Sequence, residues 1–337
     1  PPPPPHTPPP PPHPTTSRCS SAASDVYKRQ LLSVLRFEGI YTPVITPHDK
    51  TGRIDESAFV AQIEYLISAG VHGIISGGST GEYYAQSIDE RVHLARVARK
   101  TIDGRIPLIV GTGAIQQPDS VAIAHAARDM GADGILVGSP PYAVPTEREN
   151  ALNALAIDRA ANLPVMLYNF PGRMGVNMGE EFLDRVGRSG NFCAIKESSG
   201  DINRVHLLAR NYPHIQMSCG MDDQALEFFA WGARSWVCGG SNFLPQAHIA
   251  LYQACVIEGD FDRGRRIMSA LMPLMHLLEQ GGKFIQTIKY GVELGGRLAG
   301  PPRPPLKPLN KDDKRALEQV VRVIRATLNT IEAEGRT

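Results

Sequence analysis

The sequence predicts an α/β protein, a (β/α)8 TIM barrel followed by a small C-terminal helical domain. Short apolar runs recur eight times between residues 41 and 240, and each is followed by a segment with helical periodicity. After about residue 260 the strand-like runs stop, and only apolar stripes at helical spacing continue. Eight repeats of a strand, a helix and a return to a parallel neighbour form the pattern that closes a barrel.

The first 36 residues are set apart from this pattern. A proline tract is followed by a small polar segment, and proline tracts favour extended polyproline II rather than a packed core. The stretch SAASDVYKRQ (21–30) is typical of translated adaptor or vector sequence, and a native flexible extension is the alternative. The apolar region of a signal peptide is missing. We therefore expect residues 1–36 to be a disordered or non-native leader.

The eight predicted strands are YTPVIT (41–46), HGIIS (72–76), PLIVG (107–111), GILVGS (134–139), PVMLYN (164–169), CAIKES (193–198), IQMSC (215–219) and WVCGG (236–240). Helical patterns such as those of residues 55–70 and 119–132 lie between them, each with an acid at its start and glycine near its end. A doubly wound open sheet is the alternative fold. It is disfavoured because no GxGxxG motif follows the first strand.

Two long helices are predicted in the C-terminal region, over residues 261–280 and 312–334. The proline-rich stretch 300–309 reads as a rigid crossing between them. Met268, Met272 and Met275 are interpreted as helix packing rather than as ligands. The expected domains are a barrel over residues 37–260 and a helical domain over residues 261–337.

Composition excludes several classes of function. The formal net charge is +1 and 20% of residues are charged, so no strong field favours nucleic acid or an anionic membrane. No apolar run approaches the length of a membrane span. The five cysteines form no CxxC pair and the ten histidines show no ligand spacing, so we expect free thiols, no metal and a cytoplasmic location.

Lys196 is the strongest candidate for catalysis, because it stands at the inner end of the apolar run CAIKES. Its neighbour Glu197 points to the opposite face of a strand and cannot pair with it. Burial lowers the pKa of an amine, and a neutral amine is a nucleophile that forms a Schiff base with a ketone. A lysine held in a buried ion pair is the structural alternative.

Further candidates follow the other strands, at the edge where (β/α)8 enzymes carry their reactive groups. Tyr168 ends the fifth predicted strand and can relay protons, or can be a core tyrosine. GGSTGE (77–82) offers two hydroxyls and free backbone N–H groups that suit a carboxylate, although such turns also serve geometry alone. Glu82 reads as a supporting acid rather than a general base. Arg173 offers a bidentate fork for a second carboxylate, with a surface arginine as the alternative.

GGSTGE, YNFPGR and AIKESSGD, in this order, resemble the dihydrodipicolinate synthase and N-acetylneuraminate lyase family over residues 37–310. The resemblance implies that Lys196 forms an imine with pyruvate, that Tyr168 and Ser79 relay protons, and that no other cofactor is needed. It also implies a second tyrosine, Tyr142, that acts in a neighbouring protomer of a homotetramer built as a dimer of dimers. The substrate-binding positions that it implies are Thr80, Gly78, Arg173, Gly220, Asp222 and Val237.

The resemblance leaves the individual reaction open. Arg173 favours 4-hydroxy-tetrahydrodipicolinate synthase, which condenses pyruvate with aspartate semialdehyde. Ser79 in place of threonine and the acids in CGMDD (219–223) favour a 2-keto-3-deoxy sugar-acid aldolase or dehydratase, or an N-acetylneuraminate lyase-like enzyme. A hydroxypyrroline-carboxylate deaminase and a non-catalytic keto-acid sensor complete the alternatives. An acid pair that points into the pocket would favour polyol substrates. Pro141, before the second tyrosine, puts feedback by lysine in doubt.

Overall fold

The structure is a computed structural model that describes residues 35–334. The expectation of a disordered or non-native leader falls almost entirely on residues outside this range. Within this range, residues 36–334 belong to one compact unit. The proposed division of that unit into a barrel and a helical domain stays a prediction.

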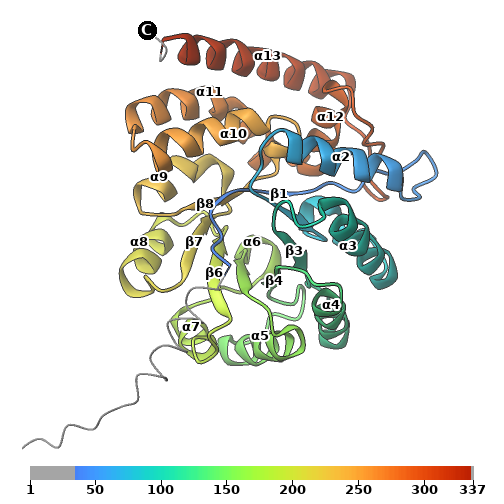
Figure 1. Ribbon diagram of the computed structural model, residues 1–337, viewed down its shortest axis with the longest axis vertical. Coiled ribbons are helices and arrows are strands. Elements are labelled where there is room, and N and C mark those ends of the chain that lie inside the picture. The colour runs from blue at the N-terminus through green and yellow to red at the C-terminus, as the bar shows by residue number, and fades with distance from the viewer. Residues whose placement is uncertain (1–34, 335–337) are drawn as a thin grey trace, which may run out of the picture. The chain divides into compact units, whose positions relative to one another are not determined.

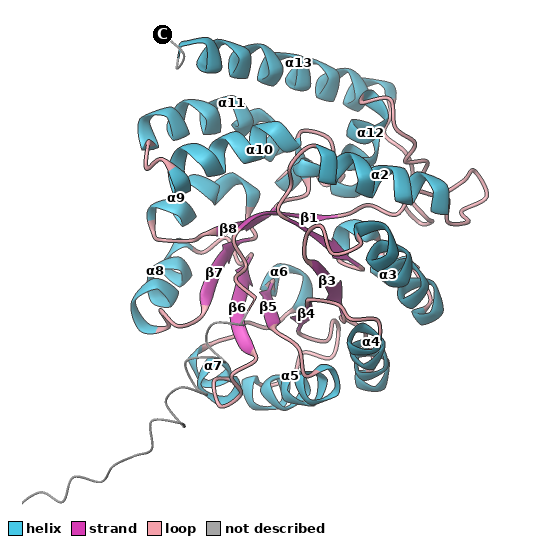
Figure 2. Ribbon diagram, in the orientation of Figure 1, coloured by secondary structure: helices cyan, strands magenta, loops and turns pink. Residues whose placement is uncertain are grey.

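Eight parallel strands close into a barrel in sequence order, as predicted (Figure 2). They are β1 (Gly39–Pro43), β2 (Gly73–Ser76), β3 (Leu108–Gly111), β4 (Gly134–Gly138), β5 (Val165–Asn169), β6 (Phe192–Glu197), β7 (Gln216–Cys219) and β8 (Ser235–Val237). The barrel closes where Ile40 of β1 pairs with Trp236 of β8. All eight predicted strands are therefore present, and the open sheet is excluded.

Two strands end three residues before their predicted ends, and the other six end within one residue of theirs. The first strand ends at Pro43, three residues earlier than expected, and the chain then leaves the barrel, where Asn242 accepts a hydrogen bond from the N–H of Ile45. The last strand ends at Val237, and Gly240–Asn242 form a single tight helical turn. Apolar runs fix which residues are buried, but they do not fix where strand pairing stops.

Helices surround the barrel (Figure 1). The ones that connect strands are α2 (Glu56–Ser68), α3 (Ile88–Ile102), α4 (Gln117–Asp129), α5 (Glu147–Ala161), α6 (Pro171–Met174), α7 (Glu180–Val186), α8 (Ile202–Asn211) and α9 (Ala225–Ala230). Their starts follow the sequence signals. Asp55 caps α2 by accepting from the N–H of Ala58, and Ser87 and Thr146 form capping boxes at α3 and α5.

The C-terminal region adds α10 (Pro245–Tyr252), α11 (Phe261–Glu279), α12 (Phe284–Leu294) and α13 (Lys311–Glu334). Helix α11 packs against α10, α12 and α13. Its stripe buries Met268 and Met275, which confirms that these methionines serve packing. Helix α12 was not predicted as a separate element. It contributes Phe284 to the pocket described below.

Candidate active site

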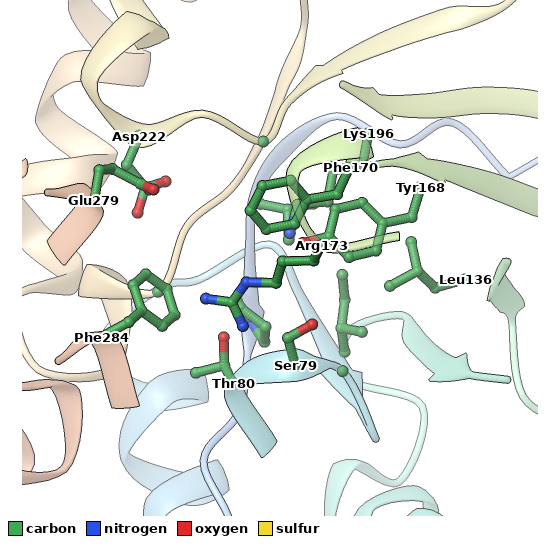
Figure 3. Close-up of a pocket in the computed structure, with 16 residues that line it drawn as sticks. Ser79, Thr80, Leu136, Tyr168, Phe170, Arg173, Lys196, Asp222, Glu279 and Phe284 are labelled. Atoms are coloured by element: carbon green, nitrogen blue, oxygen red, sulfur yellow. The ribbon is translucent and has the colours of Figure 1, made fainter. Parts of the chain in front are cut away.

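Lys196 and Tyr168 lie side by side on neighbouring strands, where β5 and β6 place them in register. Residues in register on parallel strands share a face, so both side chains enter the same pocket (Figure 3). The Nζ atom of Lys196 lies 4.1 Å from the centroid of the Tyr168 ring. Both residues are buried, with 8% of Lys196 and 7% of Tyr168 exposed.

Glu197 and Asn169, one residue further along the same strands, face away from this pocket. Asn169 Nδ2 donates to both carboxylate oxygens of Glu197, at 3.1 and 2.9 Å. The N–H of Ser199 donates to the same carboxylate, and the guanidinium of Arg204 lies 3.5 Å from it. Glu197 is thus fully partnered elsewhere, as its place on the strand predicted. Among the described residues, no carboxylate forms an ion pair with Lys196.

The GGSTGE segment forms a turn opposite Lys196. Ser79–Gly81 make one turn of helix after Gly78, and Glu82 ends it in the left-handed conformation with φ 58°. The first N–H groups of a helical turn have no acceptor within the turn, so those of Ser79 and Thr80 are available to a ligand. Gly78, Ser79 and Thr80 all line the pocket. Glu82 does not line it, which agrees with a supporting role.

Arg173 lies on the short helix α6, which follows β5. Pro171 starts this helix, and Gly175 ends it with φ 73°. The guanidinium lies 5.3 Å from the centroid of the Phe170 ring, and both side chains line the pocket. Arg173 is solvent-exposed, as the surface alternative predicted. It also lines the pocket, as the binding hypothesis predicted (Figure 3).

Two acids form a further wall of the pocket. Asp222 follows β7 and is 2% exposed, and its Oδ1 accepts a hydrogen bond of 2.8 Å from Trp236 Nε1. Glu279 ends α11, and its carboxyl lies beside that of Asp222 (Figure 3). Burial, and then the charge of Glu279, raise the pKa of Asp222. Burial also raises the pKa of Glu279, whereas a hydrogen bond from the backbone N–H of Asp222 lowers it. The charge of Lys196 lowers the pKa of both acids.

Gly220 and Val237 complete the wall near the lysine. A Cβ atom at Gly220 would lie 2.1 Å from Ser198 Oγ and 2.7 Å from Lys196 Cγ, so only glycine fits there. Val237 ends β8 and is 2% exposed. The backbone of Gly220 therefore packs directly against the lysine side chain and limits where its amine can lie.

The structure brings nine of the ten predicted site residues together around this pocket: Gly78, Ser79, Thr80, Tyr168, Arg173, Lys196, Gly220, Asp222 and Val237. The tenth, Tyr142, does not line it. Tyr142 lies in the loop after β4, is 93% exposed and has φ 71°. That position agrees with the implied role in a neighbouring protomer but does not test it.

Six side chains that the sequence did not predict also line the pocket: Pro43, Ile75, Leu136, Phe170, Glu279 and Phe284. Glu279 follows buried Met275 by four residues on α11, so an acid on a mainly apolar helix face was the available signal. The acid pair was expected in CGMDD, as Asp222 with Asp223. The structure instead pairs Asp222 with Glu279, because α11 ends at the pocket.

The described part of the chain shows no arrangement of three or more histidine, cysteine, aspartate or glutamate side chains that could hold a metal ion. Cys193, Cys219, Cys238 and Cys255 are free thiols. Residues 35–334 include no helix with the length and apolar character that crossing a membrane requires.

Comparisons with known proteins agree with this geometry. The model of the dihydrodipicolinate synthetase family matches residues 36–324. The 4-hydroxy-tetrahydrodipicolinate synthase of Methanoculleus marisnigri is 33% identical over 85% of this chain and 98% of its own. The structure of the synthase from Methylacidiphilum fumariolicum SolV superposes with a TM-score of 0.84 at 28% identity, covering 88% of this chain and 99% of that one. YagE, a prophage protein from E. coli K12 solved in complex with pyruvate, gives 0.80 at 29% identity, covering 86% of this chain and 99% of its own.

Proposed function

The chain belongs to the dihydrodipicolinate synthetase family, and we propose that it is a Schiff-base enzyme that condenses pyruvate with aspartate semialdehyde, a 4-hydroxy-tetrahydrodipicolinate synthase. One observation carries the proposal. The amine of Lys196 lies at the inner end of β6, without a carboxylate partner among the described residues, beside Tyr168 and across from the Ser79–Thr80 turn.

The chemistry begins with attack of the Lys196 amine on the keto carbon of pyruvate. The carbinolamine then loses water and becomes a protonated imine. Tyr168, with the hydroxyl of Ser79, takes and returns the protons of these steps. The N–H groups of the Gly78–Thr80 turn hold the carboxylate of pyruvate. Loss of a methyl proton gives the enamine, whose carbon attacks the aldehyde carbon. The amino group of the second substrate then adds to the imine carbon and displaces the Lys196 amine, which closes the ring of the product and frees the lysine.

Arg173 binds the carboxylate of the second substrate, aspartate semialdehyde. Its guanidinium reaches the pocket from α6 and offers two parallel N–H donors to a carboxylate. A second candidate function is a 2-keto-3-deoxy sugar-acid aldolase or N-acetylneuraminate lyase-like enzyme. Asp222 in the pocket favours it, because carboxylates accept hydrogen bonds from hydroxyl groups. Both functions use the same imine.

The proposal includes three further statements. The covalent imine replaces any cofactor. The protein works as a homo-oligomer, a dimer of dimers, in which Tyr142 enters the pocket of a neighbouring protomer. Its location is the cytoplasm, a reducing compartment that suits the free cysteines among the described residues.

Trapping the imine tests the proposal. Intact mass is measured after incubation with pyruvate and sodium borohydride, for the parent, Lys196→Ala and Lys307→Ala, which removes an exposed lysine. We expect a gain of roughly 72 Da in the parent and in the control, and no gain in Lys196→Ala, because reduction fixes pyruvate on the amine. No gain in the parent would refute the proposal.

A further inference from the structure

Asp222 has one carboxylate oxygen with no hydrogen-bond donor. Its Oδ1 accepts from Trp236, whereas its Oδ2 is buried and has no partner among the described residues. A buried acceptor that lacks a donor is costly, since it has lost its water and gained nothing in return. Because Asp222 lines the pocket, a substrate group that carries N–H or O–H can supply this donor.

Glu279 lines the same wall of the pocket, beside Asp222. In Figure 3 its carboxyl points toward that of Asp222, although the two residues come from different parts of the chain. Two carboxyls in a buried site cannot both ionise easily, and burial raises the pKa of each. A cation placed between them would stabilise both in the ionised form.

Arg173 lies across the pocket from these acids (Figure 3). A reactant bound beside the pyruvate imine therefore meets a guanidinium on one side and two carboxyls on the other. Opposite charges at two sides of one site fit a zwitterion, which carries a carboxylate and an ammonium group. The charge of Arg173 also lowers the pKa of Glu279, so the guanidinium and this acid act on each other. A neutral polyol would satisfy the carboxyls by hydrogen bonds but would bring no carboxylate to the guanidinium.

We infer that Asp222 and Glu279 together bind the ammonium group of an amino aldehyde while Arg173 binds its carboxylate, which makes Glu279 a residue that determines specificity for the second substrate. The inference rests on the proposed function and names the chemistry of that substrate. An ammonium group has three donors and can serve both carboxylates at once. A lone hydroxyl has one donor and can serve only one.

The test compares two aldehydes that differ by one amino group, aspartate semialdehyde and succinate semialdehyde. Pyruvate consumption is followed for the parent, Glu279→Gln and Asp222→Asn. Asp262→Asn, on the exposed face of α11, is the control. We expect each pocket variant to raise KM for aspartate semialdehyde by about tenfold or more, since a hydrogen bond to a charged group is lost. The borohydride adduct should still form in both variants, and KM for succinate semialdehyde should rise much less than KM for aspartate semialdehyde.

The outcomes separate this inference from the proposed function. A parent that forms the pyruvate adduct but does not consume aspartate semialdehyde refutes both the synthase assignment and the ammonium site. A parent that consumes it, together with pocket variants of parental KM, refutes only the ammonium site. Equal losses with both aldehydes also refute it, because the amino group would then play no part. Preference of the parent for glyceraldehyde, lost in the variants, would assign the acids to hydroxyl groups instead.

Discussion

The ammonium of Lys289 lies 2.6 Å from the carboxylate of Glu82, and the two side chains are 2% and 0% exposed. The N–H of Arg303 donates to the other oxygen of Glu82, at 2.9 Å. Lys289 comes from α12, whereas Glu82 ends the turn that presents Ser79 and Thr80. The C-terminal region thus fixes the back of the proposed pyruvate site through one buried ion pair.

Removing one partner of this pair should be far more harmful than removing both. Lys289→Met leaves the Glu82 carboxylate buried beside a methyl group, and we expect a loss of about 3–5 kcal/mol in the free energy of unfolding. Glu82→Gln combined with Lys289→Met removes both charges and should recover part of that loss. Urea denaturation of the two variants and the parent measures the effect. Equal losses in the single and double variants would mean that the ion pair is not what holds the turn.

A methyl group at Gly220 should displace Lys196. The added Cβ would lie 2.7 Å from Lys196 Cγ and 2.8 Å from its Cε, so the lysine side chain must move. A displacement of about 1 Å at a reacting group costs on the order of a hundredfold in rate. We expect Gly220→Ala to slow formation of the borohydride-trapped adduct by that factor. Gly190→Ala, where a Cβ would meet nothing within 4 Å, should keep the parental rate.

Acid should destabilise the protein through its buried histidines. Burial lowers the pKa of His248 to about 4, and burial together with the charge of Lys289 lowers that of His48 to about 4. Both side chains are neutral in the folded state and gain a proton on unfolding below the ordinary histidine pKa of about 6.5. The stability that they contribute is therefore complete above pH 6.5 and is lost as the pH falls toward 4.

The loss at full titration is about 3 kcal/mol for each histidine. Urea denaturation between pH 7.5 and pH 4 should show that the two histidines take up two protons from solvent on unfolding. His248→Leu should reduce that uptake by one proton, because leucine does not titrate. Among the described residues, His248 Nδ1 hydrogen-bonds only to the carbonyl of Leu244, so the substitution disturbs a single hydrogen bond. A parental pH slope in His248→Leu would contradict the assignment.

The fold and most of the site could be predicted from local signals in the sequence. Lys196 and Tyr168 were predictable because each interrupts or ends an apolar strand, and the barrel then forces neighbouring strand ends together. Glu279 and Phe284 could not be found in the same way. They lie on helices of the C-terminal region. Helical periodicity predicts which face of such a helix is buried, but it does not predict which part of the barrel that face contacts. The partner of Glu82 was hidden for the same reason, since Lys289 is 207 positions later in the sequence.

Tyr142 gives the sharpest test of the proposed oligomer. Its side chain is 93% exposed in a single chain, and the neighbouring Val144 is 59% exposed with φ 47°. Large apolar side chains held at a surface loop are typical of a contact with another protein.

If Tyr142 acts in a neighbouring protomer, two inactive variants should complement each other. Lys196→Ala supplies an intact Tyr142, and Tyr142→Phe supplies an intact lysine, so a mixed dimer regains one complete site. Each variant alone should show little activity, and coexpressed subunits should regain part of the parental rate. Mixed oligomers that stay inactive would mean that Tyr142 acts within its own chain.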